Sequence, residues 1–203
     1  MLDLVIATRN RGKFRELADL CRVRGLRWHS LSEYPRGRAV REDGRTFEAN
    51  ARKKATAAAR AAGLPALADD SGLEVEALGW GPGVKSARFA GRHGDDRANN
   101  ARLLHRLRGA PPSRRRARYR CVLALASPSR VLAVTRGTWT GRIAERPKGR
   151  HGFGYDPLFL VPGTGKTVGQ LPASVKRRLS HRAAAARAMR PALRRLAASG
   201  RGR

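Results

Sequence analysis

The sequence has few cysteines and no long apolar run, and each absence excludes a class of protein. Cys21 and Cys121 are far apart and neither belongs to a Cys-x-x-Cys pair, which excludes zinc-ribbon and dithiol redox motifs. No apolar stretch approaches the roughly 20 residues that a membrane-spanning helix needs. The apolar start at residues 1–7 is too short for a signal peptide. We therefore expect a reduced, cytoplasmic protein with both cysteines in its core.

Acidic residues are also scarce. The chain has 15 Asp and Glu and 44 Lys and Arg, which gives a formal net charge of +29. Arg is scattered along the whole chain, whereas a dedicated nucleic-acid arm would form a block. The chain also lacks a helix-turn-helix or zinc signature and clustered aromatic residues on strands. The charge therefore predicts only incidental, salt-sensitive polyanion binding through counterion release.

The spacing of apolar residues predicts a mixed α/β fold. Aromatic residues are only 5% of the chain, so Ala, Val and Leu have to fill most of the interior. With no repeat and no linker, residues 1–203 read as a single domain with a frayed tail at 199–203. Strands are expected at 2–7, 64–68, 73–77, 118–127, 131–140 and 159–161. Helices are expected at 12–24, at 46–62, between the cap Asp95 and Gly109, and at 174–189, with Pro191 as a break or kink.

Two of the few acidic residues, Asp69 and Asp70, are adjacent and lie between the two predicted strands at 64–68 and 73–77. Neighbouring carboxylates beside apolar strands are costly without positive charge, which favours a metal and a phosphate ester. One carboxylate would bind the ion and the other would handle a proton. The run Asp69–Gly72 is equally compatible with a tight turn. Glu42 is a candidate for a further oxygen ligand.

The segment Thr8-x-Asn10-x-x-Lys13 joins a predicted strand to a predicted helix, where amides and the helix dipole favour an anion. An ordinary solvated Lys is the alternative. The run at 163–167 ends like a P-loop, but Leu160 stands where that motif requires Gly.

A second set of candidates lies in Gly152-Phe-Gly-Tyr-Asp-Pro157. Phe153 could stack on a flat base and Asp156 could bond its edge. A Gly-Pro turn with core aromatic residues is the alternative. Lys176 and Ser180 are four residues apart and would share a helix face.

Taken in order, these segments resemble the inosine triphosphate pyrophosphatase family from Leu4 to about Met189. The matching motifs are Thr8-x-Asn10-x-x-Lys13-x-x-Glu16, Thr46-Phe-x-x-Asn50-Ala, Ala68-Asp-Asp-Ser-Gly-Leu73, Pro82-Gly-Val-x-Ser-Ala-Arg88, Gly152-Phe-Gly-Tyr-Asp-Pro157 and Ser180-His-Arg182. The resemblance implies an elongated mixed β-sheet with flanking helices and two lobes with the active-site cleft between them. It also implies a homodimer and Mg²⁺-dependent hydrolysis of deaminated purine nucleoside triphosphates (ITP, dITP and XTP) to the monophosphate and pyrophosphate.

The same resemblance assigns roles to residues. Asp70 matches the general base and a metal ligand, with Asp69 and Glu42 as further metal-site acids. Phe153 matches the base-stacking ring, and Arg182 a donor to the 6-oxo group. The implied substrate-binding residues are Thr8, Arg9, Asn10, Arg11, Gly12, Lys13, Ser71, Phe153, Gly154, Tyr155, Asp156, Lys176, His181 and Arg182.

The chain departs from the family pattern at His151 and Gln170, and Arg9 and Arg11 add charge to the phosphate loop. A septum-inhibitor-type nucleotide pyrophosphatase is the alternative enzyme, but its opening differs from Thr8-x-Asn10-x-x-Lys13.

Overall fold

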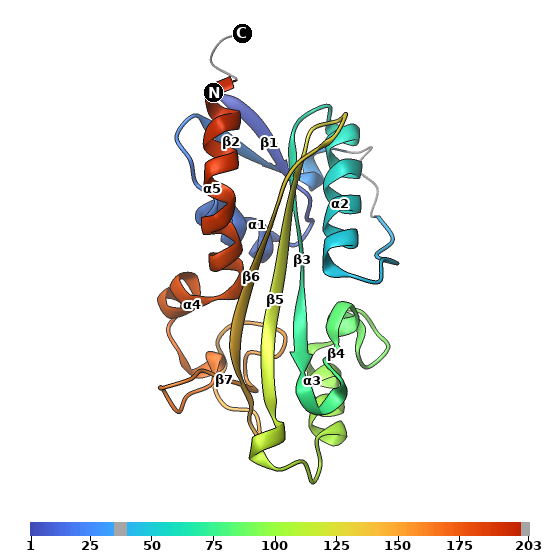
Figure 1. Cartoon of the computed structure of the whole chain (residues 1–203), viewed down its shortest axis with the longest axis vertical. Helices are drawn as coiled ribbons and strands as arrows, with labels where there is room; N and C mark the ends of the chain where they lie inside the picture. Colours follow the sequence, from blue (N-terminus) through green and yellow to red (C-terminus); the bar gives the residue numbers. More distant parts are fainter. Residues whose placement is uncertain (35–39, 200–203) are drawn as a thin grey trace. The chain divides into compact units, whose positions relative to one another are not determined.

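The computed structural model describes residues 1–34 and 40–199, which form a mixed α/β fold (Figure 1). Their seven-stranded sheet has the hydrogen-bonded order β2-β1-β3-β5-β6-β7, and β4 pairs with β3. Strand β1 is parallel to β2 and β3, whereas the β3–β4 and β6–β7 pairs are antiparallel. The strands are β1 (Leu2–Ile6), β2 (Leu26–Ser30), β3 (Ala66–Val75), β4 (Gly81–Pro82), β5 (Arg116–Ala126), β6 (Val131–Ile143) and β7 (Phe159–Leu160). The helices are α1 (Arg11–Leu20), α2 (Phe47–Ala62), α3 (Asp96–Arg106), α4 (Ala173–Leu179) and α5 (His181–Ser199).

The chain divides into two compact units. The first comprises Met1–Asp70, Cys121–Gly137 and the segment that begins at Arg182, and the second comprises Ser71–Arg120 and Thr138–His181. Strands β3, β5 and β6 each contribute residues to both units. The prediction of a single domain stays a prediction.

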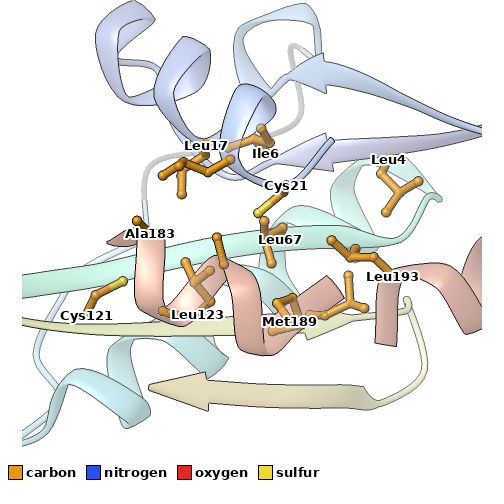
Figure 2. Close-up of a cluster of buried hydrophobic side chains, with 14 residues drawn as sticks. Leu4, Ile6, Leu17, Cys21, Leu67, Cys121, Leu123, Ala183, Met189 and Leu193 are labelled. Atoms are coloured by element: carbon orange, nitrogen blue, oxygen red, sulfur yellow. The ribbon is translucent and has the colours of Figure 1, made fainter. Parts of the chain in front are cut away.

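The core of the first unit is aliphatic, as the shortage of aromatic residues requires. Leu4 and Leu67 from the sheet pack with Leu17 from α1 and with Met189 and Leu193 from α5 (Figure 2). Both cysteines are buried in this cluster, as the sequence predicts. Each fully buried Leu or Met contributes about 1.5–3 kcal/mol, so this cluster fixes α1 and α5 on one side of the strands.

The core of the second unit contains a cluster of aromatic residues. The ring of Phe159 lies 4.5 Å from that of Tyr119 and 5.5 Å from that of Trp139, centroid to centroid. Leu103 and Leu107 of the α3 region belong to the same cluster. Asp95 caps α3, as predicted.

Several predicted elements are corrected. The strands expected at 64–68 and 73–77 are one strand, β3, which runs through the two aspartates without a turn. The helix expected at 174–189 is two helices that part at Ser180. Helix α5 continues through Pro191, because Leu193 and Ala197 beyond it are buried.

The remaining differences are smaller. Strand β2 was not predicted, because only its pairing with β1 stabilises so polar a segment. Helix α1 ends at Leu20 rather than at residue 24. Ser199 is helical, while residues 35–39 and residues 200–203 of the predicted frayed tail lie outside the described residues. None of the described helices is long and apolar enough to cross a membrane.

A histidine at the β1–β2 edge makes stability depend on pH. His29 Nε2 lies 2.8 Å from Asp3 Oδ1, and its Nδ1 lies 3.0 Å from Glu33 Oε2. Both hydrogen bonds raise the pKa of His29, and the bond to Asp3 contributes more than the bond to Glu33. The pKa of Asp3 is lowered by its hydrogen bonds to Arg27 and His29.

Because the pKa of His29 is higher in the folded protein, protonated His29 stabilises the fold. This stabilisation is fully present below the ordinary pKa of about 6.5 and is lost as pH rises through the pKa of His29 in the folded protein. The lowered pKa of Asp3 contributes stability above its ordinary pKa of about 4. Thermal unfolding of His29→Gln and the unmodified protein should therefore differ most near pH 5.2, about midway between these values, and the difference should shrink as pH rises. A difference in melting temperature that grows toward alkaline pH would contradict this assignment.

Candidate active site

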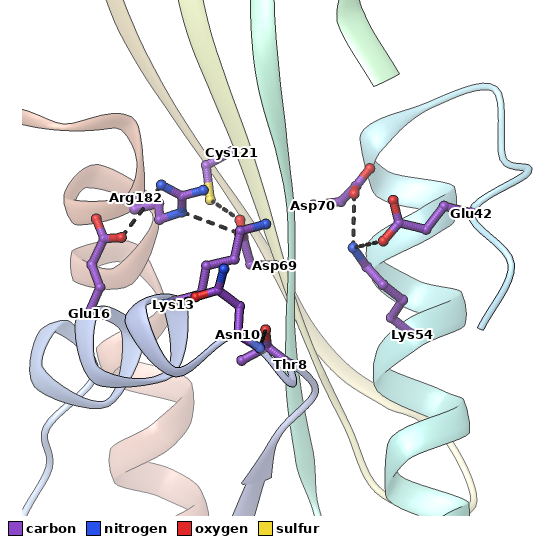
Figure 3. Close-up of polar contacts among 10 residues, drawn as sticks. All are labelled: Thr8, Asn10, Lys13, Glu16, Glu42, Lys54, Asp69, Asp70, Cys121 and Arg182. Carbon is purple, nitrogen blue, oxygen red and sulfur yellow. Dashed lines mark hydrogen bonds and ion pairs between the residues drawn. The ribbon is translucent and has the colours of Figure 1, made fainter. Parts of the chain in front are cut away.

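The aspartate pair is divided between the two faces of β3. Successive side chains of a strand point to opposite faces, so a continuous strand separates two neighbouring carboxylates. Figure 3 shows Asp69 directed toward α1 and α5, and Asp70 directed toward α2. Asp69 and Asp70 therefore lie in two separate polar centres, and the expectation that Asp69, Asp70 and Glu42 belong to one metal site stays a prediction.

The first centre is a buried ion network around Asp69. Arg182 Nε lies 3.2 Å and Lys13 Nζ 4.0 Å from Asp69 Oδ2, while Cys121 Sγ–H donates to Oδ1 at 3.1 Å. Arg182 Nη1 also lies 3.5 Å from Glu16. Burial opposes the charge of Asp69, but Arg182 and Lys13 outweigh it and hold the pKa of this carboxyl well below its usual range. Asp69 is therefore a fixed anion, unsuited to taking up a proton.

The second centre places an ammonium between two carboxylates. Lys54 Nζ on α2 donates to Asp70 Oδ1 at 2.9 Å and to Glu42 Oε1 at 2.9 Å. Asn50 Nδ2, one turn earlier on α2, donates to Asp70 Oδ2 at 3.2 Å. Burial raises the pKa of Asp70 although Lys54 opposes the shift. A buried carboxylate with a raised pKa is suited to accept a proton.

The donor set of this second centre fits a hard cation. Mg²⁺ in nucleotide enzymes is commonly bound by one or two carboxylates together with substrate phosphates and water. Glu42 and Asp70 supply two carboxylates whose oxygens already converge on one positive charge, that of Lys54. Within 1–34 and 40–199, no cluster of three or more His, Cys, Asp or Glu residues forms a complete protein cage.

The predicted phosphate loop leads from β1 into α1. Asn10 caps the helix, because its side chain accepts from the backbone N–H of Lys13 at 3.0 Å. Thr8 Oγ1 accepts from the Asn10 N–H at 3.2 Å. Arg9 and Arg11 are exposed, and Gly12 and Lys13 occupy the first turn of α1. Desolvation lowers the pKa of Lys13, and Asp69 opposes this shift.

The second unit contains a compact group around Asp156. Its Oδ1 accepts from the Tyr119 hydroxyl at 3.2 Å, and its Oδ2 accepts from the Phe153 N–H at 2.9 Å and contacts the Lys176 ammonium. Lys176 Nζ lies 4.1 Å from the centroid of the Phe153 ring, which is 43% exposed. A Cβ at Gly152 would lie 2.0 Å from Asp156 Oδ2. Glycine at this position therefore allows the carboxylate to approach the loop and accept from the Phe153 N–H.

The other predicted site residues are placed as follows. Tyr155 is buried, and its hydroxyl donates to the Ser86 carbonyl at 2.8 Å. The His181 ring stacks on Tyr119 at 4.7 Å, whereas its neighbour Arg182 belongs to the first unit. Ser71 follows Asp70 in β3.

Sequence reasoning missed Lys54 and Cys121. Lys54 lies eight residues after the helix cap Thr46, and its position on the buried side of an Ala-rich helix was an available signal. Cys121 carried no local signal, because its role depends on Asp69, which lies on another strand.

The P-loop-like run at 163–167 has a structural role. Thr167 is buried, donates its hydroxyl to the Lys148 carbonyl at 2.7 Å and forms a capping box with Gln170.

Comparison with known proteins identifies the family of this chain. Residues 4–192 match the model of the Ham1 family. The dITP/XTP pyrophosphatase of Geobacillus kaustophilus is 50% identical over 185 residues, which are 91% of each chain, and that of Desulforamulus reducens is 51% identical over 181 residues, 89% of this chain and 90% of the relative. A HAM1 protein from Coxiella burnetii has a TM-score of 0.88 at 38% identity and covers 96% of this chain and 100% of its own.

A solved structure from Mycobacterium abscessus described as a nucleoside-triphosphatase / dITP/XTP pyrophosphatase has a TM-score of 0.78 at 43% identity, covering 94% of this chain and 100% of its own. Together with the family-model match over most of the chain, these likenesses confirm the family expected from the ordered motifs. The chain belongs to the Ham1 family.

Proposed function

We propose that this protein hydrolyses dITP, XTP and ITP to the nucleoside monophosphate and pyrophosphate. Its membership of the Ham1 family, together with the activity named for relatives about 50% identical over nine-tenths of the chain, makes it a nucleoside triphosphate pyrophosphatase. The observation that carries the chemistry is Asp70, a buried carboxylate of raised pKa held by Lys54 and Asn50.

The reaction assigned to the first unit is attack of water on the α-phosphorus. Asp70 accepts the proton of the water, the bond from the α-phosphorus to its bridging oxygen breaks, and pyrophosphate leaves. Lys13 and the N-terminus of α1 supply positive charge to the phosphates. Glu42 and Asp70 are the residues we propose to hold Mg²⁺, which when bound neutralises phosphate charge.

Asp69 takes a different role from the one expected. Because it lies on the other face of β3 against Arg182, Lys13 and Cys121, we assign it to positioning Lys13 rather than to the metal.

Base recognition is assigned to the second unit. The Phe153 ring offers a stacking face, and Lys176, held by Asp156, offers N–H donors to a 6-oxo group. An ammonium has no acceptor, so it cannot pair with the 6-amino group of adenine. Arg182, expected as a base reader, instead pairs with Asp69 and Glu16, so Lys176 is the better candidate.

Truncating the stacking ring should weaken substrate binding. Phe153→Ala is expected to raise the KM for ITP, because it removes base–aromatic stacking that contributes about 1–3 kcal/mol to binding. The kcat should change much less. Steady-state kinetics on ITP measures both constants. An unchanged KM would show that the base does not stack on this ring.

The function is tested by a pyrophosphate-release screen of nucleoside triphosphates with and without Mg²⁺. ITP, dITP and XTP should release pyrophosphate only with the metal, and ATP far more slowly. Release of orthophosphate would contradict attack at the α-phosphorus, and equal rates on ATP would contradict selection for the 6-oxo group. The homodimer implied by the resemblance belongs to the same proposal and is checked by light scattering of the purified protein.

A further inference from the structure

Two side chains of helix α3 form hydrogen bonds with the loop that carries the Phe153 ring. Asp96 Oδ2 accepts from the backbone N–H of Gly154 at 2.6 Å, and Asn100 Nδ2 donates to the Gly154 carbonyl at 2.9 Å. Asp96 and Asn100 are four residues apart and therefore lie on one face of the helix. Both backbone groups of one glycine are thus held by two side chains of one rigid element.

Gly154 is the residue next to Phe153, and its left-handed backbone (φ 62°) turns the loop at that point. On the other side of the ring, the Phe153 N–H is held by Asp156 Oδ2. Because Phe153 is 43% exposed, core packing contributes little to the orientation of its ring, and the way its backbone is held contributes more. The contacts from α3 supply part of this fixation.

We propose that Asp96 and Asn100 are positioning residues for base recognition, acting through the Gly154 peptide on the Phe153 ring; the proposal rests on the function proposed above. Neither side chain needs to touch the substrate. The role requires an acceptor at position 96 and a donor at position 100, and it does not require the charge of Asp96.

The first test is independent of any nucleotide. Amide hydrogen exchange of the peptide covering 152–156 is measured on the ligand-free full chain. Asp96→Ala and Asn100→Ala should each speed exchange in this loop about tenfold, the effect of losing one hydrogen bond to a rigid partner. Asp96→Asn, which keeps an acceptor oxygen, should restore slow exchange. Equal exchange in all variants would overturn the proposal.

The second test measures the affinity for IMP by calorimetry, with inorganic pyrophosphate as a probe that lacks the base. Asp96→Ala should weaken IMP binding about tenfold and leave pyrophosphate binding unchanged, while Asp96→Asn should bind IMP like the unmodified protein. The exposed Arg97 on the same helix provides the control, because Arg97→Ala should change neither affinity. Equal loss for IMP and pyrophosphate would indicate general damage and overturn the proposal.

A double-mutant cycle separates positioning from an unrelated contribution. In the Phe153→Ala background, Asp96→Ala should weaken IMP binding by less than twofold, because the ring that it positions is already absent. Additive effects would overturn the proposal. If the unmodified protein released no pyrophosphate from ITP, the proposed function would fail, whereas the exchange experiment would still decide whether α3 holds the loop.

Discussion

Asp70→Asn is expected to lower kcat for ITP hydrolysis by about 10²–10⁴-fold, the usual contribution of a general base. The substituted amide has nearly the same shape, and its one oxygen can still accept a hydrogen bond from Lys54, so the fold should persist. What disappears is the group that takes a proton from water and one of the two carboxylates that face Lys54. Pyrophosphate release measures the rate, and circular dichroism checks the fold.

Asp43→Asn is the matched control for this loss. Asp43 is an exposed carboxylate next to Glu42, and it pairs with Lys53 at 2.7 Å, away from Asp70. Its change removes the same charge from the same region without touching the proposed base, so kcat should stay within about twofold. Wild-type turnover in folded Asp70→Asn protein would refute the role of Asp70.

Asp69→Ala is expected to destabilise the protein by about 3–5 kcal/mol, because it removes the centre of a buried ion network. Arg182 is 4% exposed and would lose its ion pair with Asp69, which leaves the pair with Glu16 at 3.5 Å. Lys13 would lose its opposite charge in the same step. Urea unfolding gives the change in free energy, and the large effect follows from desolvated charge rather than from lost contact area.

Two comparisons isolate this mechanism. Asp69→Asn keeps one acceptor oxygen and the shape of the side chain, and it should cost less than Asp69→Ala because Arg182 retains an acceptor. Asp43→Ala removes an exposed pair and should have little effect. If Asp69→Ala were no more destabilising than Asp43→Ala, the network would contribute nothing to stability.

Some features were accessible from the residues because they depend on near neighbours in the chain. Thr46 and Gly63 define the ends of α2, since a capping side chain and a left-handed glycine act within one helical turn. The hairpin of β5 and β6 follows from two apolar runs around a Ser-Pro-Ser turn. The ordered motifs indicated the family in the same way.

The sequence by itself therefore determined the helix caps, the mixed α/β class, the family and the chemical types of the candidate residues. Only the tertiary structure decided that Asp69 and Asp70 face opposite sides, because Asp-Asp-Ser-Gly fits both a turn and a strand, and its place in β3, between β1 and β5 in the sheet, makes it a strand. It also selected Lys54 and Arg182 from 44 basic residues. Local preferences cannot make that choice, because an ion pair such as Asp69–Arg182, 113 residues apart, exists only once the chain has folded.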